Sequence, residues 1–188
     1  MFDWKEILDF WFGELDEHGL PDSDHRNKWF RSDRRFDQEI RRRFLSMVLF
    51  ASEQGLDHWR SEAGGILAEI ILLDQFSRNI FRGGAMAFDQ DRQARKLCRQ
   101  AMQKGQDMML APVHRAFLYM PLQHSELKED QDMSVECYEP ATRPWEGPQL
   151  RRSRITWKVG DGSVNEMIAV SLKFCIKNVH SDGVGNFP

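Results

Sequence analysis

The stretch from Ile66 to Gly84, ILAEIILLDQFSRNIFRGG, is apolar where it begins and polar where it ends. Its apolar residues recur every three or four positions, as they do on a helix. They form two neighbouring stripes rather than one: Ile66, Ile70 and Leu73, and Leu67 with Ile71. Because such a helix is apolar over more than one face, other elements must cover it on several sides. The stretch therefore predicts a helix at the centre of a helical core.

The polar end of this stretch carries charged groups at the edge of the buried surface. The second stripe continues into Asp74 and Arg78, one turn apart, with Gln75 and Asn79 beside them. One interpretation is that Asp74 and Arg78 pair and close the helix before the two glycines that follow. The other is that these four side chains contact a ligand. The sequence leaves both interpretations open.

Two more helices are predicted from acidic caps that precede apolar residues at helical spacing. Asp3, with Glu6 at the return position of a capping box, begins a helix that runs to Leu15. Asp33 begins a helix that ends at Gly55 and has one apolar side: Phe36, Ile40, Phe44, Met47, Val48 and Ala51. Between these helices, residues 17–28 are polar and include a glycine and a proline, which predicts a connection.

The stretch RAFLYMPLQHSE, residues 115–126, is the second informative one. It belongs to a helix that begins near Pro112 and contains Pro121, which removes one backbone hydrogen bond and favours a bend. A bend beside His124 and Glu126 is typical of a functional site. The alternative is that His124 is a satisfied histidine and Glu126 a salt-bridge partner.

The remaining pattern completes a helical fold. We expect another helix over residues 86–104, with Phe88 on its inward side. Helices with short connections and almost no strand pattern indicate an all-α class built from antiparallel helix pairs. Residues 1–138 would form this domain, 139–163 an irregular or disordered segment rich in proline and arginine, and 164–188 a helix and tail that pack on the same domain.

Composition narrows the class of protein. The 188 residues carry a formal net charge of -3, and the basic residues are too dispersed to predict nucleic-acid binding. No apolar run approaches the about 18 residues of a membrane span, and the N-terminus lacks the features of a signal peptide. Three cysteines without CxxC spacing argue against a disulfide scaffold or a zinc site, and no two histidines have ligand-like helical spacing. We therefore expect a cytoplasmic protein without a membrane anchor, metal or cofactor.

Several long motifs occur in order along the chain. They include ILDFWFG at residues 7–13, LLDQFSRNIFRG at 72–83 and RAFLYMPLQHSE at 115–126. Through them the chain resembles a bacterial family of uncharacterised proteins, domain-of-unknown-function family 924, over residues 4–138. The resemblance implies a tetratricopeptide-like array of helices and supplies no reaction. The chain departs from the family motif at Gln123, where the family has Glu, and at residues 185–188, which match only the first half of the family's GRFPHRN.

Three functions are compatible with these patterns. The preferred hypothesis is a binding protein, because guanidinium groups bind carboxylates and phosphates through paired hydrogen bonds. Its polar pocket would hold a small anion or an acidic peptide, with the contacts made by Arg78, Asn79, Arg82, Arg115, Gln75 and Tyr119.

The second hypothesis is an enzyme, a hydrolase or lyase that acts on an anionic substrate. His124 and Glu126 would be its acid and base, with Asp74 as a third group able to move protons. The third hypothesis is that the polar rows are purely structural and join helix to helix through internal ion pairs.

Overall fold

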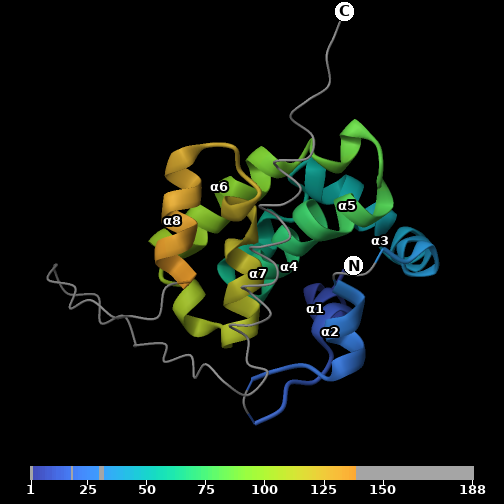
Figure 1. Ribbon diagram of the computed structural model, residues 1–188, viewed down its shortest axis with the longest axis horizontal. Helices are drawn as coiled ribbons and strands as arrows, with labels where there is room; N and C mark the ends of the chain where they lie inside the picture. The colour runs from blue at the N-terminus through green and yellow to red at the C-terminus, as the bar shows by residue number, and fades with distance from the viewer. Residues whose placement is uncertain (1, 18, 30–31, 139–188) are drawn as a thin grey trace, which may run out of the picture.

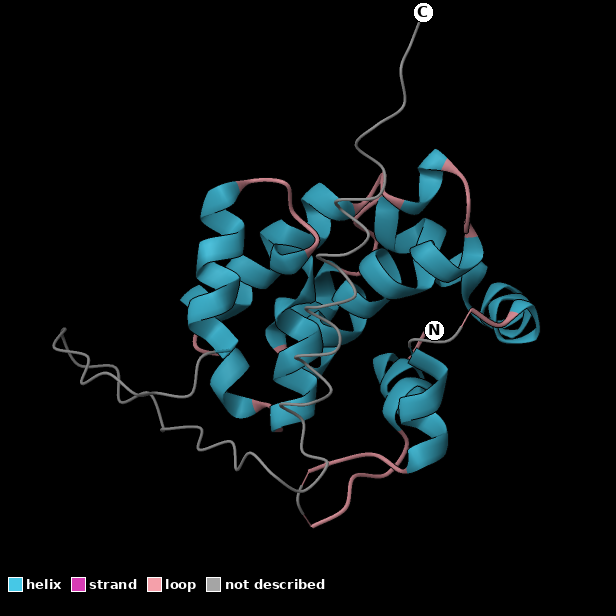
Figure 2. Ribbon diagram, in the orientation of Figure 1, coloured by secondary structure: helices cyan, strands magenta, loops and turns pink. Residues whose placement is uncertain are grey.

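The computed structural model describes residues 2–17, 19–29 and 32–138, and in this part of the chain helices are joined by short turns (Figure 2). Its α-helices are α1 (Trp4–Phe12), α2 (Ser23–Trp29), α3 (Arg34–Ser52), α4 (Ala63–Ile70), α5 (Ser77–Ile80), α6 (Asp91–Gln103), α7 (Pro112–Gln123) and α8 (Lys128–Tyr138). Three short 3-10 turns occupy Asp57–Ser61, Ala85–Ala87 and Asp107–Met109. One isolated β-bridge joins Leu15 to Pro21. The predicted all-α class is confirmed.

Parts of the sequence prediction remain open. The segments predicted over 139–163 and 164–188 lie outside the described residues. The tetratricopeptide-like pairing of the helices and the domain boundary at residue 138 stay predictions. Within the described ranges, no helix combines the length and the apolar composition that crossing a membrane would require.

The two predicted acidic caps are confirmed. The Asp3 carboxylate accepts a hydrogen bond from the Lys5 backbone N–H at 3.0 Å and begins α1. Asp33 accepts from the backbone N–H of Arg35 at 2.8 Å and begins α3, whose buried residues are those of the predicted stripe. Glu6 pairs with Arg43 of α3 at 3.1 Å. The Glu6 carboxylate, which was expected at the return position of a capping box, thus ties α1 to α3.

The prediction of a plain connection over residues 17–28 is wrong, because Ser23–Trp29 form α2. Asp22 begins this helix: its carboxylate accepts from the His25 backbone N–H at 2.9 Å and contacts the His25 ring at 2.8 Å. Trp29 is the buried residue of α2, so the segment has no apolar stripe that a sequence pattern could reveal.

The helix expected over residues 86–104 begins later than predicted, at Asp91. The chain before it forms the turn Ala85–Ala87, and Phe88 is 60% exposed rather than inward. The Arg78 guanidinium instead lies over the Phe88 ring, with its Cζ atom 4.8 Å from the ring centroid. A cation–π contact at the surface therefore replaces the expected core contact.

The core surrounds α4 and α7, which lie in the middle of the molecule (Figure 1). α4 contacts α1, α6 and α7, and α8 packs against α7 at the left of Figure 1. Aromatic rings fill the space toward the N-terminal helices: Trp11 meets Phe76 at 5.4 Å and Phe117 at 5.8 Å between ring centroids. Every apolar residue of the two stripes in the central stretch is buried, as predicted.

Candidate functional site

The central stretch does not continue as one α-helix. Residues Ile71–Phe76 form a π-helical turn between α4 and α5, in which the Ser77 backbone N–H donates to the Leu72 carbonyl five residues back. The Ser77 hydroxyl donates to the same carbonyl at 3.2 Å. A π turn carries one extra residue, is rare, and is found frequently at functional sites. It changes the direction in which Asp74 and Gln75 leave the helix.

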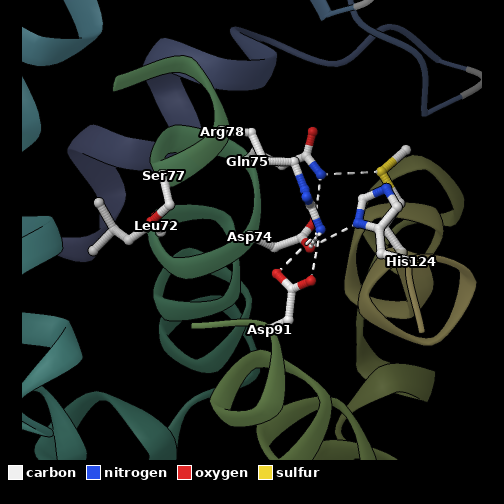
Figure 3. Close-up of polar contacts among 8 residues, drawn as sticks. Leu72, Asp74, Gln75, Ser77, Arg78, Asp91 and His124 are labelled. Carbon is white, nitrogen blue, oxygen red and sulfur yellow. Dashed lines mark hydrogen bonds and ion pairs between the residues drawn. The ribbon is translucent and has the colours of Figure 1, made fainter. Parts of the chain in front are cut away.

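Asp74, on the π turn, pairs with His124 at the end of α7. Nδ1 of His124 lies 2.7 Å from Oδ1 of Asp74, and Figure 3 shows the imidazole facing the carboxylate. The Asp74 side chain is 1% exposed, whereas that of His124 is 16% exposed. The carboxylate is thus buried behind an imidazole that reaches the surface.

Arg78 and Asp91 complete the cluster (Figure 3). The Nη2 atom of Arg78 donates to both carboxylate oxygens of Asp91 at 3.1 Å and to Asp74 at 3.4 Å. Gln75 donates to Asp74 and, at 3.4 Å, to the sulfur of Met120. We define Asp74, Arg78, Asp91 and His124 as the acid–base cluster. It joins the π turn, the start of α6 and the end of α7.

The two carboxyl groups of the cluster are shifted in opposite directions. Burial alone would raise the pKa of Asp74, but the charge and hydrogen bond of His124, helped by Arg78 and Gln75, lower it to about 2. Burial raises the pKa of Asp91 above its ordinary value, and the nearby Asp74 carboxylate adds to this, although Arg78 opposes it. At neutral pH Asp74 is therefore a fixed negative charge, and Asp91 is the more readily protonated carboxyl group.

Two of the predicted ligand-binding residues meet a different carboxylate. Asn79 donates to Asp37 of α3 at 2.7 Å, and Arg82 forms two hydrogen bonds to the same group at 2.7 and 2.8 Å. Burial opposes ionisation of Asp37, but these contacts outweigh it and lower its pKa. Asn79 and Arg82 therefore join α5 and the following turn to α3.

Arg115 and Tyr119 of α7 belong to a third, buried group beside the turn Asp107–Met109. The Tyr119 hydroxyl donates to Asp107 at 2.6 Å, and burial together with this bond raises the pKa of Tyr119. Arg115 is 8% exposed and donates to the sulfur of Met108 at 3.1 Å. The residues expected to line one pocket are thus distributed over three groups.

Comparison with known proteins identifies the family. The profile described as "Bacterial protein of unknown function (DUF924)" matches residues 7–170. The chain belongs to this family. The match continues past residue 138, where the motifs recognised in the sequence end.

A solved structure from Agrobacterium tumefaciens is similar to this chain. The protein of unknown function ATU0120 is 32% identical to this chain, with a TM-score of 0.63, over 71% of this chain and 70% of its own. A search of the curated proteins finds no match.

Within this DUF924 protein, the acid–base cluster differs from the predicted catalytic set. Glu126 is exposed in the turn between α7 and α8, and the partner of His124 in the cluster is Asp74. Asp91 was not predicted to be part of a site, because it lies 13 residues from Arg78 and its role depends on how α6 folds back.

The described part of the DUF924 chain contains no grouping of three or more His, Cys, Asp or Glu side chains placed to hold a metal ion. The acid–base cluster contains two aspartates and a histidine, but Arg78 lies between the two carboxylates. A guanidinium at that position occupies the space where a cation would sit. The chemistry that this arrangement can offer by itself is proton transfer.

Proposed function

We propose that this DUF924 protein is an enzyme that transfers protons to or from a small anionic substrate, as a hydrolase or lyase does. His124 is the acid–base residue and Asp74 orients it. The observation that carries the proposal is the 2.7 Å contact between a buried carboxylate and an imidazole that is 16% exposed. A general acid or base must be both oriented and within reach of its substrate.

The chemistry follows from the protonation state of Asp74. With a pKa of about 2, this carboxylate is ionised at neutral pH and can only accept a hydrogen bond. Nδ1 of His124 must then carry the hydrogen, so Nε2 is the nitrogen that gains and loses a proton. A buried carboxylate that fixes the tautomer of a catalytic histidine is a recurring arrangement in enzymes.

Asp91 and Arg78 support the same proposal. Two carboxyl groups whose surroundings drive their pKa values apart are a recurring feature of acid–base sites. Asp91, with its raised pKa, is suited to exchange a second proton. Arg78 donates to both aspartates and so holds the two carboxyl groups at one place.

An Arg-rich binding pocket for an anion, the hypothesis that the sequence favours, has less support. Arg78 is paired with two aspartates, Arg82 with Asp37, and Arg115 is almost fully buried. An anion at any of these arginines would compete with an internal partner. The purely structural hypothesis predicts the same ion pairs as the enzyme hypothesis, so an experiment must separate the two.

The test combines NMR of the His124 ring with activity measurements. We expect nitrogen NMR to find a hydrogen on Nδ1 of His124 at neutral pH, because Nδ1 faces an ionised Asp74 that can only accept a hydrogen bond. Turnover would be screened on chromogenic phosphate and carboxylate esters and on β-eliminating carboxylates. His124→Asn is expected to reduce any turnover by about 100-fold or more.

His58→Asn is the matched control, because His58 is an exposed histidine outside the cluster. It should keep the wild-type rate. A His124 ring without a hydrogen on Nδ1 at neutral pH would contradict the proposal, as would a His124→Asn variant with the full wild-type rate.

A further inference from the structure

The exposed side of α6 carries a row of cations. The row begins at Arg92 and continues three, four and seven residues later with Arg95, Lys96 and Arg99. Residues at these spacings lie on one face of a helix. The buried residues of α6 lie on the other side: Ala94, Leu97, Cys98 and Ala101. The four positive groups lie within about 10 Å along the helix axis, since each residue advances the helix by about 1.5 Å.

One buried carboxylate holds two of these cations in place. Asp130 of α8 is 1% exposed and forms ion pairs with Arg99 and, at 3.4 Å, with Arg95. The Ser125 hydroxyl donates to the same carboxylate at 2.6 Å. Asp130 therefore orients two guanidinium groups at the junction of α6 and α8 while offsetting the charge of only one.

The cations line a groove of about 510 Å³ between α6 and the start of α8. Gln100 and Gln103 extend its polar wall, and Leu127, which is 57% exposed, supplies an apolar edge. Arg92 and Lys96 are exposed and form no ion pair or hydrogen bond with other described side chains. Since Asp130 offsets one of the four positive charges, the groove keeps a surplus of three.

We propose that this groove binds a small molecule that carries two or more phosphate groups. A phosphate group has a charge of about -1.5 to -2 at pH 7, so two of them match the surplus. Guanidinium groups bind phosphate oxygens through paired hydrogen bonds, and a lysine adds a compact point charge. The volume falls within the range of small-molecule sites, about 300 to 1,000 Å³.

The groove is distinct from the acid–base cluster but begins close to it. Asp91 of the cluster lies one helical turn before Arg95, and His124 directly precedes Ser125. The phosphate proposal uses residues that the proposed enzyme activity does not, so it can be tested by binding alone.

The experiment is isothermal titration calorimetry of the full chain with inorganic pyrophosphate as the probe. The test variant is Arg92→Gln/Lys96→Gln, which removes two exposed charges without breaking an internal ion pair. The control is Arg34→Gln/Arg42→Gln, which removes two exposed charges from α3, on the other side of the molecule (Figure 1). Thermal unfolding of each variant checks that the fold is intact.

We expect wild-type chain and control to bind pyrophosphate equally, and the test variant to bind at least about tenfold more weakly. Binding should also weaken as salt rises, because exposed charges are screened. Absence of pyrophosphate binding would overturn the proposal, and so would equal loss in both double variants. Orthophosphate binding of equal strength would overturn the two-phosphate assignment, and a glutamate-rich peptide that binds where pyrophosphate does not would overturn the small-molecule assignment.

Discussion

Nδ1 of His124 and Oδ1 of Asp74 lie 2.7 Å apart, although 50 residues separate them in the chain. The contact joins the π turn of the central stretch to the end of α7, two segments that the sequence motifs had marked separately. Because Asp74 is almost completely buried, its charge must be compensated inside the protein, and His124 together with Arg78 does this. The stability of the fold and the proposed chemistry thus depend on one carboxylate.

Asp74→Asn should destabilise the protein at neutral pH by about 2 to 3 kcal/mol, since a pKa shift of one unit corresponds to about 1.4 kcal/mol. The folded-state pKa of Asp74 is about 2, below the ordinary value of 3.8. Its contribution to stability is therefore fully present above the ordinary value and is lost as pH falls through the folded-state value. Urea unfolding of both proteins at pH 7 and down to pH 2 would measure the difference, which should shrink below about pH 4.

Asp91→Asn is the matched control for this prediction. Burial raises the pKa of Asp91, so its ionised form is not favoured by folding in the way that ionised Asp74 is. We expect Asp91→Asn to lose less stability at pH 7 than Asp74→Asn does. We also expect the difference in unfolding free energy between Asp91→Asn and wild type not to shrink as the pH falls. Equal losses in both variants, independent of pH, would contradict the role assigned to Asp74.

Local patterns in the sequence predicted much of this architecture. The caps at Asp3 and Asp33 and the apolar stripe of α3 depend on neighbours within one or two turns, and they are found as expected. Asp74 also pairs with Arg78, four residues away, at 3.4 Å, which was one of the two interpretations that the sequence left open. Interactions within one helix are set by its periodicity, so a sequence can reveal them.

The composition of the site could not be predicted in this way. Which side chain faces Asp74 depends on how α6 and α7 pack against the central stretch, and neither Asp91 nor the Asp37 contact with Arg82 follows from spacing. The π turn has no signature in the pattern of apolar residues, yet it determines where Asp74 points. Arginines that looked like one row were therefore divided among separate partners by tertiary packing.

A second buried carboxylate, Glu69 of α4, gives a prediction about the core. Glu69 is 0% exposed and accepts two hydrogen bonds from Arg60, at 2.7 and 2.6 Å. These hydrogen bonds raise the pKa of Arg60. Glu69→Gln leaves that guanidinium without its charge partner and should cost about 3 kcal/mol of unfolding free energy. Glu39→Gln removes a pair at 3.9 Å between the exposed Glu39 and the partly exposed Arg43, and should cost less than about 1 kcal/mol. Similar losses in urea unfolding would show that the burial of Glu69 does not matter.

Gly65 in α4 tests how closely two backbones approach. A Cβ at this position would overlap the carbonyl oxygen of Trp59, which is backbone and cannot move aside without disturbing the turn Asp57–Ser61. Gly65→Ala should therefore destabilise the protein by about 1 to 3 kcal/mol, the usual cost of overpacking. At Gly84 the nearest atom would be the Phe81 carbonyl oxygen at 3.4 Å, so Gly84→Ala should leave the midpoint of thermal unfolding almost unchanged. A Gly65→Ala variant as stable as Gly84→Ala would mean that α4 can shift away from Trp59.

Arg78 and Arg82 offer a final comparison, between two arginines one turn apart. Arg78 is 23% exposed and bridges two aspartates, whereas Arg82 is 45% exposed and pairs with Asp37. Arg78→Gln should cost about 2 kcal/mol, because Asp74 and Asp91 would face each other without the intervening cation. Arg82→Gln should cost less than about 1 kcal/mol, since water screens its ion pair. For a chain of this length each kcal/mol lowers the unfolding midpoint by roughly 2 to 4 °C, so thermal unfolding can resolve the difference. If Arg78→Gln melts at the wild-type temperature, repulsion between Asp74 and Asp91 is negligible, and the opposite pKa shifts of the two carboxyl groups must come from burial and His124 alone.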